Sequence, residues 1–74
     1  MDVLLFGIIA ERAGSASISV EAVSIQELQQ ELITRIPGMQ ALSYTVAVDR
    51  IAVYEDRVLR GTEEIAILPP FAGG

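Results

Sequence analysis

The stretch VSIQELQQELITRIPG, residues 23–38, decides the fold because it contains the start, the buried face and the end of one helix. Ser24 and Glu27 have the spacing of a capping box, in which each side chain accepts a hydrogen bond from the backbone N–H of the other residue. This predicts a helix that begins at Ile25. Apolar residues recur every three or four positions and predict one buried stripe: Ile25, Leu28, Leu32 and Ile36. Pro37-Gly38 ends the helix, because proline disfavours helical conformation in the residue before it.

Two apolar segments precede this helix and are predicted to pair as a β-hairpin. Residues 3–9, VLLFGII, form a continuous apolar run that predicts the first strand. Residues 17–20 alternate polar and apolar side chains, as in a strand with one solvent-facing side. Residues 11–15 are expected to form the loop between these strands, in which Gly14 can adopt a positive φ.

Three more strands are expected after the helix. Residues 44–48 and 51–54 flank Asp49-Arg50, which predicts a hairpin with a two-residue connection, and residues 64–68 form the last strand. The predicted order is β-β-α-β-β-β. One helix can cover only one face of the resulting sheet. The predicted fold class is therefore α+β, a β-grasp (ubiquitin-like) mixed sheet with one main helix packed across one face and the first and last strands adjacent at its centre.

Side-chain alternation predicts which strand residues face the helix. Those expected beneath it are Val3, Leu5, Ile18, Val20, Val46, Val48, Ile65 and Ile67. Phe6 and Leu68, which each follow a residue of this set, would therefore point outward. With Ala52 or Ala66 nearby, they would form an exposed apolar patch that marks a protein contact. Apolar residues scattered singly over the surface are the alternative interpretation.

The composition excludes several classes of function. Ten acidic residues against five arginines give a formal charge of −5, which argues against nucleic acid as a partner and favours a basic protein. Cys, His, Lys and Trp are absent. The chain therefore lacks the usual zinc ligands and the side chains that most often act as acid, base or Schiff-base former near neutral pH. This argues against a metal site and against an enzyme that works alone.

The length leaves room for one small domain. The apolar run at residues 3–10 follows Asp2 rather than a basic stretch and is too short to span a bilayer. We therefore expect no membrane partner, and the cytoplasm is the default location. Residues 1–74 are predicted to form a single domain, in which residues 69–74 are a flexible functional tail.

The last six residues, Pro69-Pro70-Phe71-Ala72-Gly73-Gly74, form the most specific motif in the chain. The prolines have no N–H to continue a sheet, and they stiffen the segment into an extended stalk. At full extension the six residues reach about 20 Å from the domain. Because the last two residues have no side chains, the chain could pass through a narrow tunnel and place its carboxylate in the active site of another protein. A frayed tail without function is the alternative.

A β-grasp chain of this length that ends in Pro-Pro-apolar-x-Gly-Gly resembles the small, sulfur-carrying subunit of molybdopterin synthase, in the MoaD/ThiS group of sulfur carrier proteins. The resemblance spans the whole chain in element order, and Gly14, the capped helix and the Val48-Asp49 hairpin stand where that family has similar features. Only the final six residues are specific. The family commonly has an acidic-Gly turn before the last strand, where this chain has Arg60-Gly61-Thr62-Glu63.

The resemblance implies chemistry at Gly74. An E1-like adenylyltransferase would use ATP to convert the Gly74 carboxylate to an acyl-adenylate, and a sulfur donor protein would then displace AMP to leave a thiocarboxylate. The large subunit of molybdopterin synthase would take in the tail and pass the sulfur to a pyranopterin precursor. The chain itself would bind no cofactor. The implied partner-binding residues are Phe6, Leu68, Pro69, Pro70 and Phe71, and Ala72 and Gly73 would thread into the partner ahead of Gly74.

Three other functions remain open at the level of sequence. A thiamine-pathway sulfur carrier also ends in Gly-Gly on the same fold, although such proteins usually lack the Pro-Pro pair. A ubiquitin-like interaction module would have an inert tail. A protein modifier of the ubiquitin type would instead become joined through Gly74 to a lysine of another protein.

Overall fold

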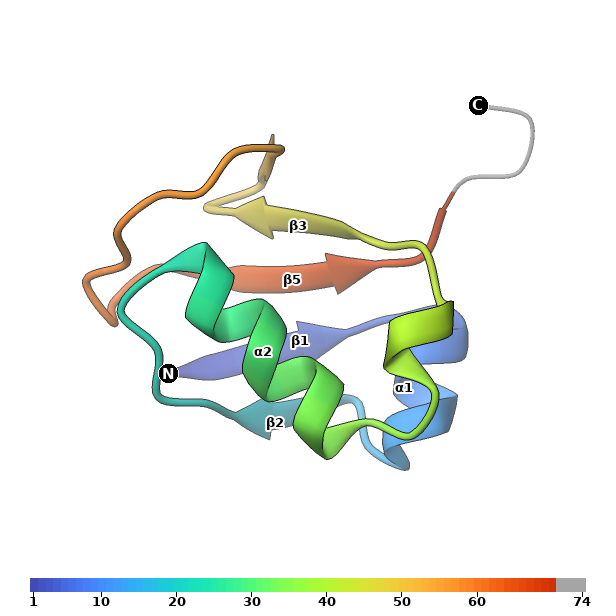
Figure 1. Ribbon diagram of the computed structural model, residues 1–74. Helices are drawn as coiled ribbons and strands as arrows, with labels where there is room; N and C mark the ends of the chain where they lie inside the picture. The colour runs from blue at the N-terminus through green and yellow to red at the C-terminus, as the bar shows by residue number, and fades with distance from the viewer. Residues whose placement is uncertain (71–74) are drawn as a thin grey trace.

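A single mixed sheet with two helices forms the fold, as the computed structural model shows for residues 1–70, the part of the chain that it describes (Figure 1). The elements in chain order are β1 (Asp2–Leu5), α1 (Gly7–Ala13), β2 (Ser17–Ser19), α2 (Ile25–Arg35), the 3-10 turn η1 (Met39–Ala41), β3 (Thr45–Val48), β4 (Ile51–Val53) and β5 (Ile65–Leu68). The five strands lie in the order β2-β1-β5-β3-β4. β1 and β5 are parallel at the centre, and the other neighbours are antiparallel. This arrangement confirms the predicted β-grasp fold.

The main helix, α2, lies across one face of the sheet (Figure 1). Its predicted stripe is confirmed, since Ile25, Leu28, Leu32 and Ile36 are each 4% exposed or less. The strand residues predicted beneath it are buried, except Ile18, which is half-buried at the edge strand. Burial of each large aliphatic side chain contributes ~1.5–3 kcal/mol to folding. The core therefore lies between α2 and one face of the sheet.

The start of α2 follows the predicted cap with one difference. Ser24 Oγ accepts from the N–H of Glu27 at 3.2 Å, but Glu27 Oε1 accepts from the N–H of Val23 at 3.3 Å rather than from Ser24. A second cap comes from a distant loop, where Asp56 Oδ1 accepts from the N–H of Gln26 at 2.9 Å. Two carboxylates and a hydroxyl thus accept hydrogen bonds from N–H groups at the start of α2. The carboxylates are also favoured there because the helix dipole places partial positive charge at the N-terminal end.

The prediction of one strand over residues 3–9 is wrong in its second half. β1 ends at Leu5, and Gly7–Ala13 form the helix α1 instead, so the predicted loop at residues 11–15 is also helical in its first part. Gly7 has a φ of +58°, which turns the chain out of the sheet, and Ile9 then enters the core from the helix with 0% exposure. Gly14 ends α1 with a φ of +73°, which confirms the prediction that this glycine adopts a positive φ. β1 and β2 pair antiparallel as predicted, with α1 in the connection.

The predicted hairpin after the main helix is confirmed. Asp49 and Arg50 connect β3 to β4 with φ values of +51° and +69°, the left-handed pair that a tight type I′ turn requires. The turn also contacts the start of β5, because the N–H of Asp49 donates to the carbonyl of Glu64 at 2.8 Å and Asp49 Oδ1 accepts from the N–H of Glu64 at 3.0 Å. These bonds offset part of the cost of placing two non-glycine residues in this conformation.

Candidate functional site

The face of the sheet opposite α2 presents apolar side chains, and no helix within residues 1–70 lies across it. The pairing register places one residue of each strand in a row across this face: Ser17, Leu4, Ala66, Ala47 and Ala52. A neighbouring row contains Leu68, which pairs with Thr45. Phe6 continues this row, because its N–H extends the β1–β5 ladder by donating to the carbonyl of Ile67 at 3.2 Å. We call this surface the outer face, and its residues are Leu4, Phe6, Ala47, Ala52, Ala66 and Leu68.

The exposure of the outer face decreases toward its centre. Phe6 is 45% exposed and Leu4 is 37% exposed, whereas Leu68 is half-buried and Ala47 is buried. Ala66 on the central strand β5 and Ala47 on β3 have short side chains, so a partner could approach the backbone beside Leu4, Phe6 and Leu68. Sequence reasoning placed Phe6 and Leu68 here but missed Leu4, which the same alternation from Val3 and Leu5 would have identified. The docking role of Phe6 and Leu68 stays a prediction.

The predicted tail begins directly at the end of β5, beside α1 (Figure 1). Pro69 is half-buried and Pro70 is exposed. The Pro69 ring lies against the backbone of Gly7, so close that a side-chain carbon at position 7 would be 2.9 Å from Pro69 Cγ. The tail therefore leaves the sheet next to Phe6 and Leu68. Phe71, Ala72, Gly73 and Gly74 lie outside the described residues, and their predicted roles stay predictions.

The turn before β5 is held by one carboxylate. Glu63 Oε2 accepts from the N–H of Arg60 at 2.8 Å, and Glu63 Oε1 accepts from the N–H of Gly61 at 2.9 Å. The backbone N–H of Arg60 is the largest cause of the lowered pKa of Glu63, because these bonds favour the ionised carboxylate. This is the segment in which the sequence departs from the acidic-Gly turn of the family that it resembles. Here the acidic side chain follows the glycine and orders the turn from its other end.

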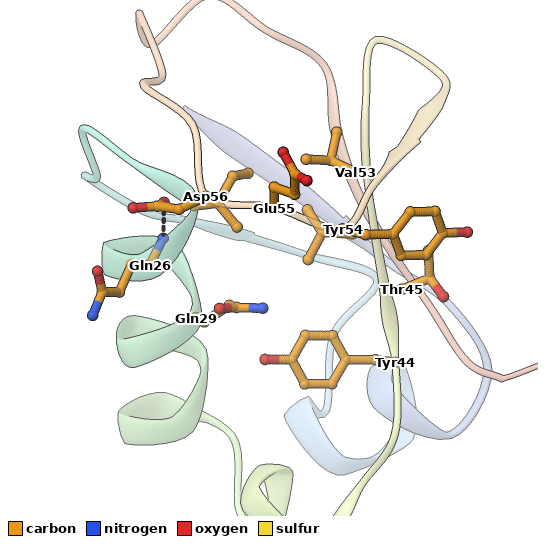
Figure 2. A pocket seen from close by; sticks show the side chains of 10 residues that line it. Gln26, Gln29, Tyr44, Thr45, Val53, Tyr54, Glu55 and Asp56 are labelled. Carbon is orange, nitrogen blue, oxygen red and sulfur yellow. Dashed lines mark hydrogen bonds between the residues drawn. The ribbon is translucent and has the colours of Figure 1, made fainter.

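A groove lies between α2 and the strands β3 and β4 (Figure 2). Tyr44 and Gln29 point toward one another inside it, while Asp56 is bonded to the N–H of Gln26. Burial raises the pKa of the Tyr44 hydroxyl, and its hydrogen bond with Gln29 lowers it in part. Of the predicted site residues that lie within residues 1–70, which are Phe6, Leu68, Pro69 and Pro70, none lines this groove.

The described residues contain no cluster of side chains of the kind that holds a metal ion. Across residues 1–70, no three acidic side chains are grouped so that they could hold a metal ion. Nor is any helix in this part of the chain long and apolar enough to cross a membrane. The features that residues 1–70 do combine are an apolar face and the start of a proline-stiffened tail beside it.

The sequence model of the ThiS family matches residues 3–74, nearly the whole chain and all of its Pro-Pro-Phe-Ala-Gly-Gly ending. The chain belongs to the ThiS family. The predicted place in the MoaD/ThiS group is thereby confirmed, and the β-grasp described above is the ubiquitin-like fold of this sulfur-carrier type. No curated protein matches this ThiS-family chain.

Two solved structures have the same fold as this ThiS-family chain. A crystal structure of SAMP1 from Haloferax volcanii is 21% identical, with a TM-score of 0.80 over 99% of this chain and 97% of that one. A crystal structure of H. volcanii small archaeal modifier protein 1 is 19% identical, with a TM-score of 0.81 over 95% of each chain. At this identity the likeness shows the fold alone. Because sulfur carriers and a protein called a modifier share this fold, the fold does not by itself distinguish the two functions.

Proposed function

We propose that this ThiS-family chain is the sulfur carrier of molybdenum cofactor biosynthesis, the small subunit of molybdopterin synthase, and that it carries sulfur on the carbonyl carbon of Gly74. The observation that carries the proposal is the family match that extends through Gly74, on a fold whose last strand leads directly into Pro69-Pro70. Proline directly after β5 has no N–H to continue the ladder, so the sheet ends where the predicted tail begins. The absence of Cys, His and Lys fits a carrier that uses its main-chain terminus.

The proposed chemistry has three steps at the carboxyl group of Gly74. The Gly74 carboxylate attacks the α-phosphorus of ATP on an E1-like enzyme, which releases pyrophosphate and forms an acyl-adenylate. A persulfide sulfur on a donor protein then attacks the acyl carbon and AMP leaves, which gives an acyl disulfide. A second thiol of the donor cleaves the S–S bond, so that Gly74 keeps the outer sulfur as a thiocarboxylate and the donor becomes a disulfide. ATP is used by the enzyme, and the chain itself binds no cofactor.

The transfer to product would take place in the large subunit of molybdopterin synthase. The thiocarboxylate is a soft, ionised nucleophile, so it needs no side-chain base on the carrier to attack the pyranopterin precursor. Phe6 and Leu68 would dock on the partner through the outer face, Pro69 and Pro70 would aim the tail, and Phe71 would add a further contact. Ala72 and Gly73 are small enough to thread a narrow channel. The net charge of −5 favours a basic surface on the partner.

A protein modifier is the second candidate, and the likeness to small archaeal modifier protein 1 favours it. In that case the activated Gly74 would form an amide with a lysine amine of another protein and release AMP or a thiol. The chain has no lysine, so it offers no side-chain amine to which a second copy could be joined. A thiamine-pathway carrier and a module with an inert tail are the remaining alternatives.

Reconstitution followed by intact-mass measurement tests the proposal. The purified chain is incubated with an E1-like activating enzyme, ATP and a persulfide donor, and a variant without Gly74 serves as the matched control. The expected result is one oxygen-for-sulfur exchange at the C-terminal residue in the native chain and none in the control, although both remain folded. No exchange with an activating enzyme that modifies another carrier would contradict the proposal. Recovery of Gly74 in an amide bond to lysine would identify the modifier function, and transfer of sulfur to a thiazole synthase would identify the thiamine pathway.

A further inference from the structure

The contact between Gly7 and Pro69 lies where the tail leaves the sheet, and no step of the proposed sulfur transfer uses it. β1 and β5 are parallel, and Leu5 pairs with Ile67. The N–H of Phe6 extends this ladder by donating to the carbonyl of Ile67. The same register, carried two residues beyond the Leu5 pair, brings Gly7 beside Pro69.

Gly7 has two features that only glycine provides without strain. Its φ of +58° lies in the left-handed region, which L-residues with a side chain rarely adopt. A Cβ at this position would also lie 2.9 Å from Pro69 Cγ, 3.5 Å from Pro69 Cβ and 3.7 Å from Pro69 Cδ. The first of these distances is shorter than non-bonded carbon atoms tolerate. The pyrrolidine ring therefore occupies the space that a side chain at position 7 would need.

The backbone on which the Pro69 ring rests is itself anchored. Ile9, two residues after Gly7, is 0% exposed in the core, and its N–H donates to the carbonyl of Phe6 at 3.2 Å. On the other side of the contact, Pro69 is half-buried whereas Pro70 is exposed. At the end of the described chain, burial thus falls from Pro69, whose ring lies on Gly7, to Pro70.

We propose that Gly7 is a positioning residue, whose missing side chain forms a notch that holds the Pro69 ring and fixes the direction in which the tail leaves the sheet. This inference rests on the proposed function. Proline fixes its own φ, and packing of its ring against Gly7 restrains the neighbouring torsion, so the tail starts from one orientation. A partner that binds the tail then has less chain entropy to remove. Gly7 would act on the reaction only through Pro69 and would not touch the reacting atoms.

Gly7→Ala tests the notch, and Gly14→Ala is its matched control. Gly14 lies at the other end of α1 with a φ of +73°, but nothing lies within 4 Å of the Cβ that alanine would add. Both variants place alanine in the left-handed region, so both lose thermal stability, and only Gly7→Ala displaces the Pro69 ring. For pyrophosphate release on the activating enzyme, measured well below both melting temperatures, we expect kcat/KM to fall about tenfold in Gly7→Ala and less than about twofold in Gly14→Ala.

A second substitution separates tail positioning from general damage to α1. Pro69→Ala removes Cγ and Cδ, and the atom that remains, Cβ, is at an ordinary contact distance of 3.5 Å from the added carbon. In the Pro69→Ala background, Gly7→Ala should therefore lower kcat/KM no further. Two results would overturn the proposed role of Gly7. One is an equal loss of kcat/KM in Gly7→Ala and Gly14→Ala, and the other is a loss from Gly7→Ala that is as large in the Pro69→Ala background as in the native chain.

The experiments distinguish an error in the proposed role of Gly7 from an error in the proposed function. A native chain that a competent enzyme does not adenylylate contradicts the function. The notch also has a readout in the isolated chain, because nuclear Overhauser effects between the Gly7 Hα protons and the Pro69 ring are expected in the native protein and in Gly14→Ala. Their absence from the native spectrum would contradict the notch, whatever the activity.

Discussion

β1 contains two neighbouring leucines that face opposite sides of the sheet. Leu5 is 3% exposed beneath α2, whereas Leu4 is 37% exposed on the outer face. The same contrast continues along β5, where Ile65 and Ile67 are 0% exposed and Ala66 is half-buried. The inner face, which is the side of the sheet that packs against α2, stabilises the fold through burial of large aliphatic side chains. The outer face leaves Leu4 and Phe6 partly exposed, so their burial contributes less to folding than that of the side chains beneath α2. Exposed apolar patches of this kind are typical of protein contacts.

Leu5→Ala should have the largest effect on stability, and Leu4→Ala is its matched control on the same strand. Truncation of a buried leucine leaves a cavity, so we expect Leu5→Ala to lower the free energy of unfolding by ~2–5 kcal/mol. For a domain of this size that is a large share of a total of roughly 4–11 kcal/mol. Leu4→Ala should cost less than about 1 kcal/mol. Urea denaturation measures both, and equal losses would contradict the division of roles between the two faces.

Phe6→Ala should leave folding largely intact and weaken docking. We expect KM for the activating enzyme to rise about tenfold, which corresponds to ~1.4 kcal/mol, because an exposed aromatic side chain on a recognition surface often contributes this much. Val58→Ala is the control, since Val58 is 76% exposed and lies outside the outer face. If the two variants bind equally well, the outer face is not the docking surface.

Ser24→Ala should weaken the helix that covers the inner face without changing the outer face. Loss of the hydroxyl that accepts from the N–H of Glu27 is expected to cost ~1 kcal/mol of stability. The rate of modification at Gly74 should stay unchanged under conditions in which the variant is folded. Thermal denaturation and the activation assay on the same sample check both expectations, and a slowed activation step would mean that α2 contributes to recognition.

Glu63→Gln should have the smallest effect on stability, a loss that is present near neutral pH and disappears in acid. The folded-state pKa of Glu63 is lowered, chiefly by the N–H of Arg60, so its contribution to stability is present above the unfolded carboxyl pKa of about 4.3 and is lost as pH falls through the lower folded value. The stability of the native protein should therefore decline more steeply with acid than that of Glu63→Gln. Urea midpoints measured across this range test the sign, and a steeper decline in Glu63→Gln would refute it.

Local signals made α2 predictable, whereas α1 lacked them. Ser24 and the Pro37-Gly38 pair mark both ends of α2 in the sequence. α1 has only seven residues, and its N-cap, Phe6, makes no side-chain capping bond. Its apolar residues also continue directly from β1, so the run at residues 3–9 looked like one strand. The available signals were Gly7 inside the run and a helix-ending glycine at position 14.

The candidate site could be predicted in part because alternation along a strand needs no knowledge of its neighbours. This rule placed Phe6 and Leu68 on one side of the sheet, and applied to the residue two positions before Phe6 it would have included Leu4. The contact of Gly7 with Pro69 could not be found in this way. It depends on the parallel register of β1 and β5, which lie at opposite ends of the chain and are brought together only by the tertiary fold.

The central claim is that the reactive atom of this protein is the carbonyl carbon of Gly74. The most direct test is the fragment-ion mass spectrum of the C-terminal peptide from the protein isolated from its own cells. The account predicts a peptide that ends at Gly74, with a fraction in which sulfur replaces one terminal oxygen. A mature chain that continues beyond Gly74 would contradict the account, and so would a terminus that never carries sulfur in cells that make molybdopterin.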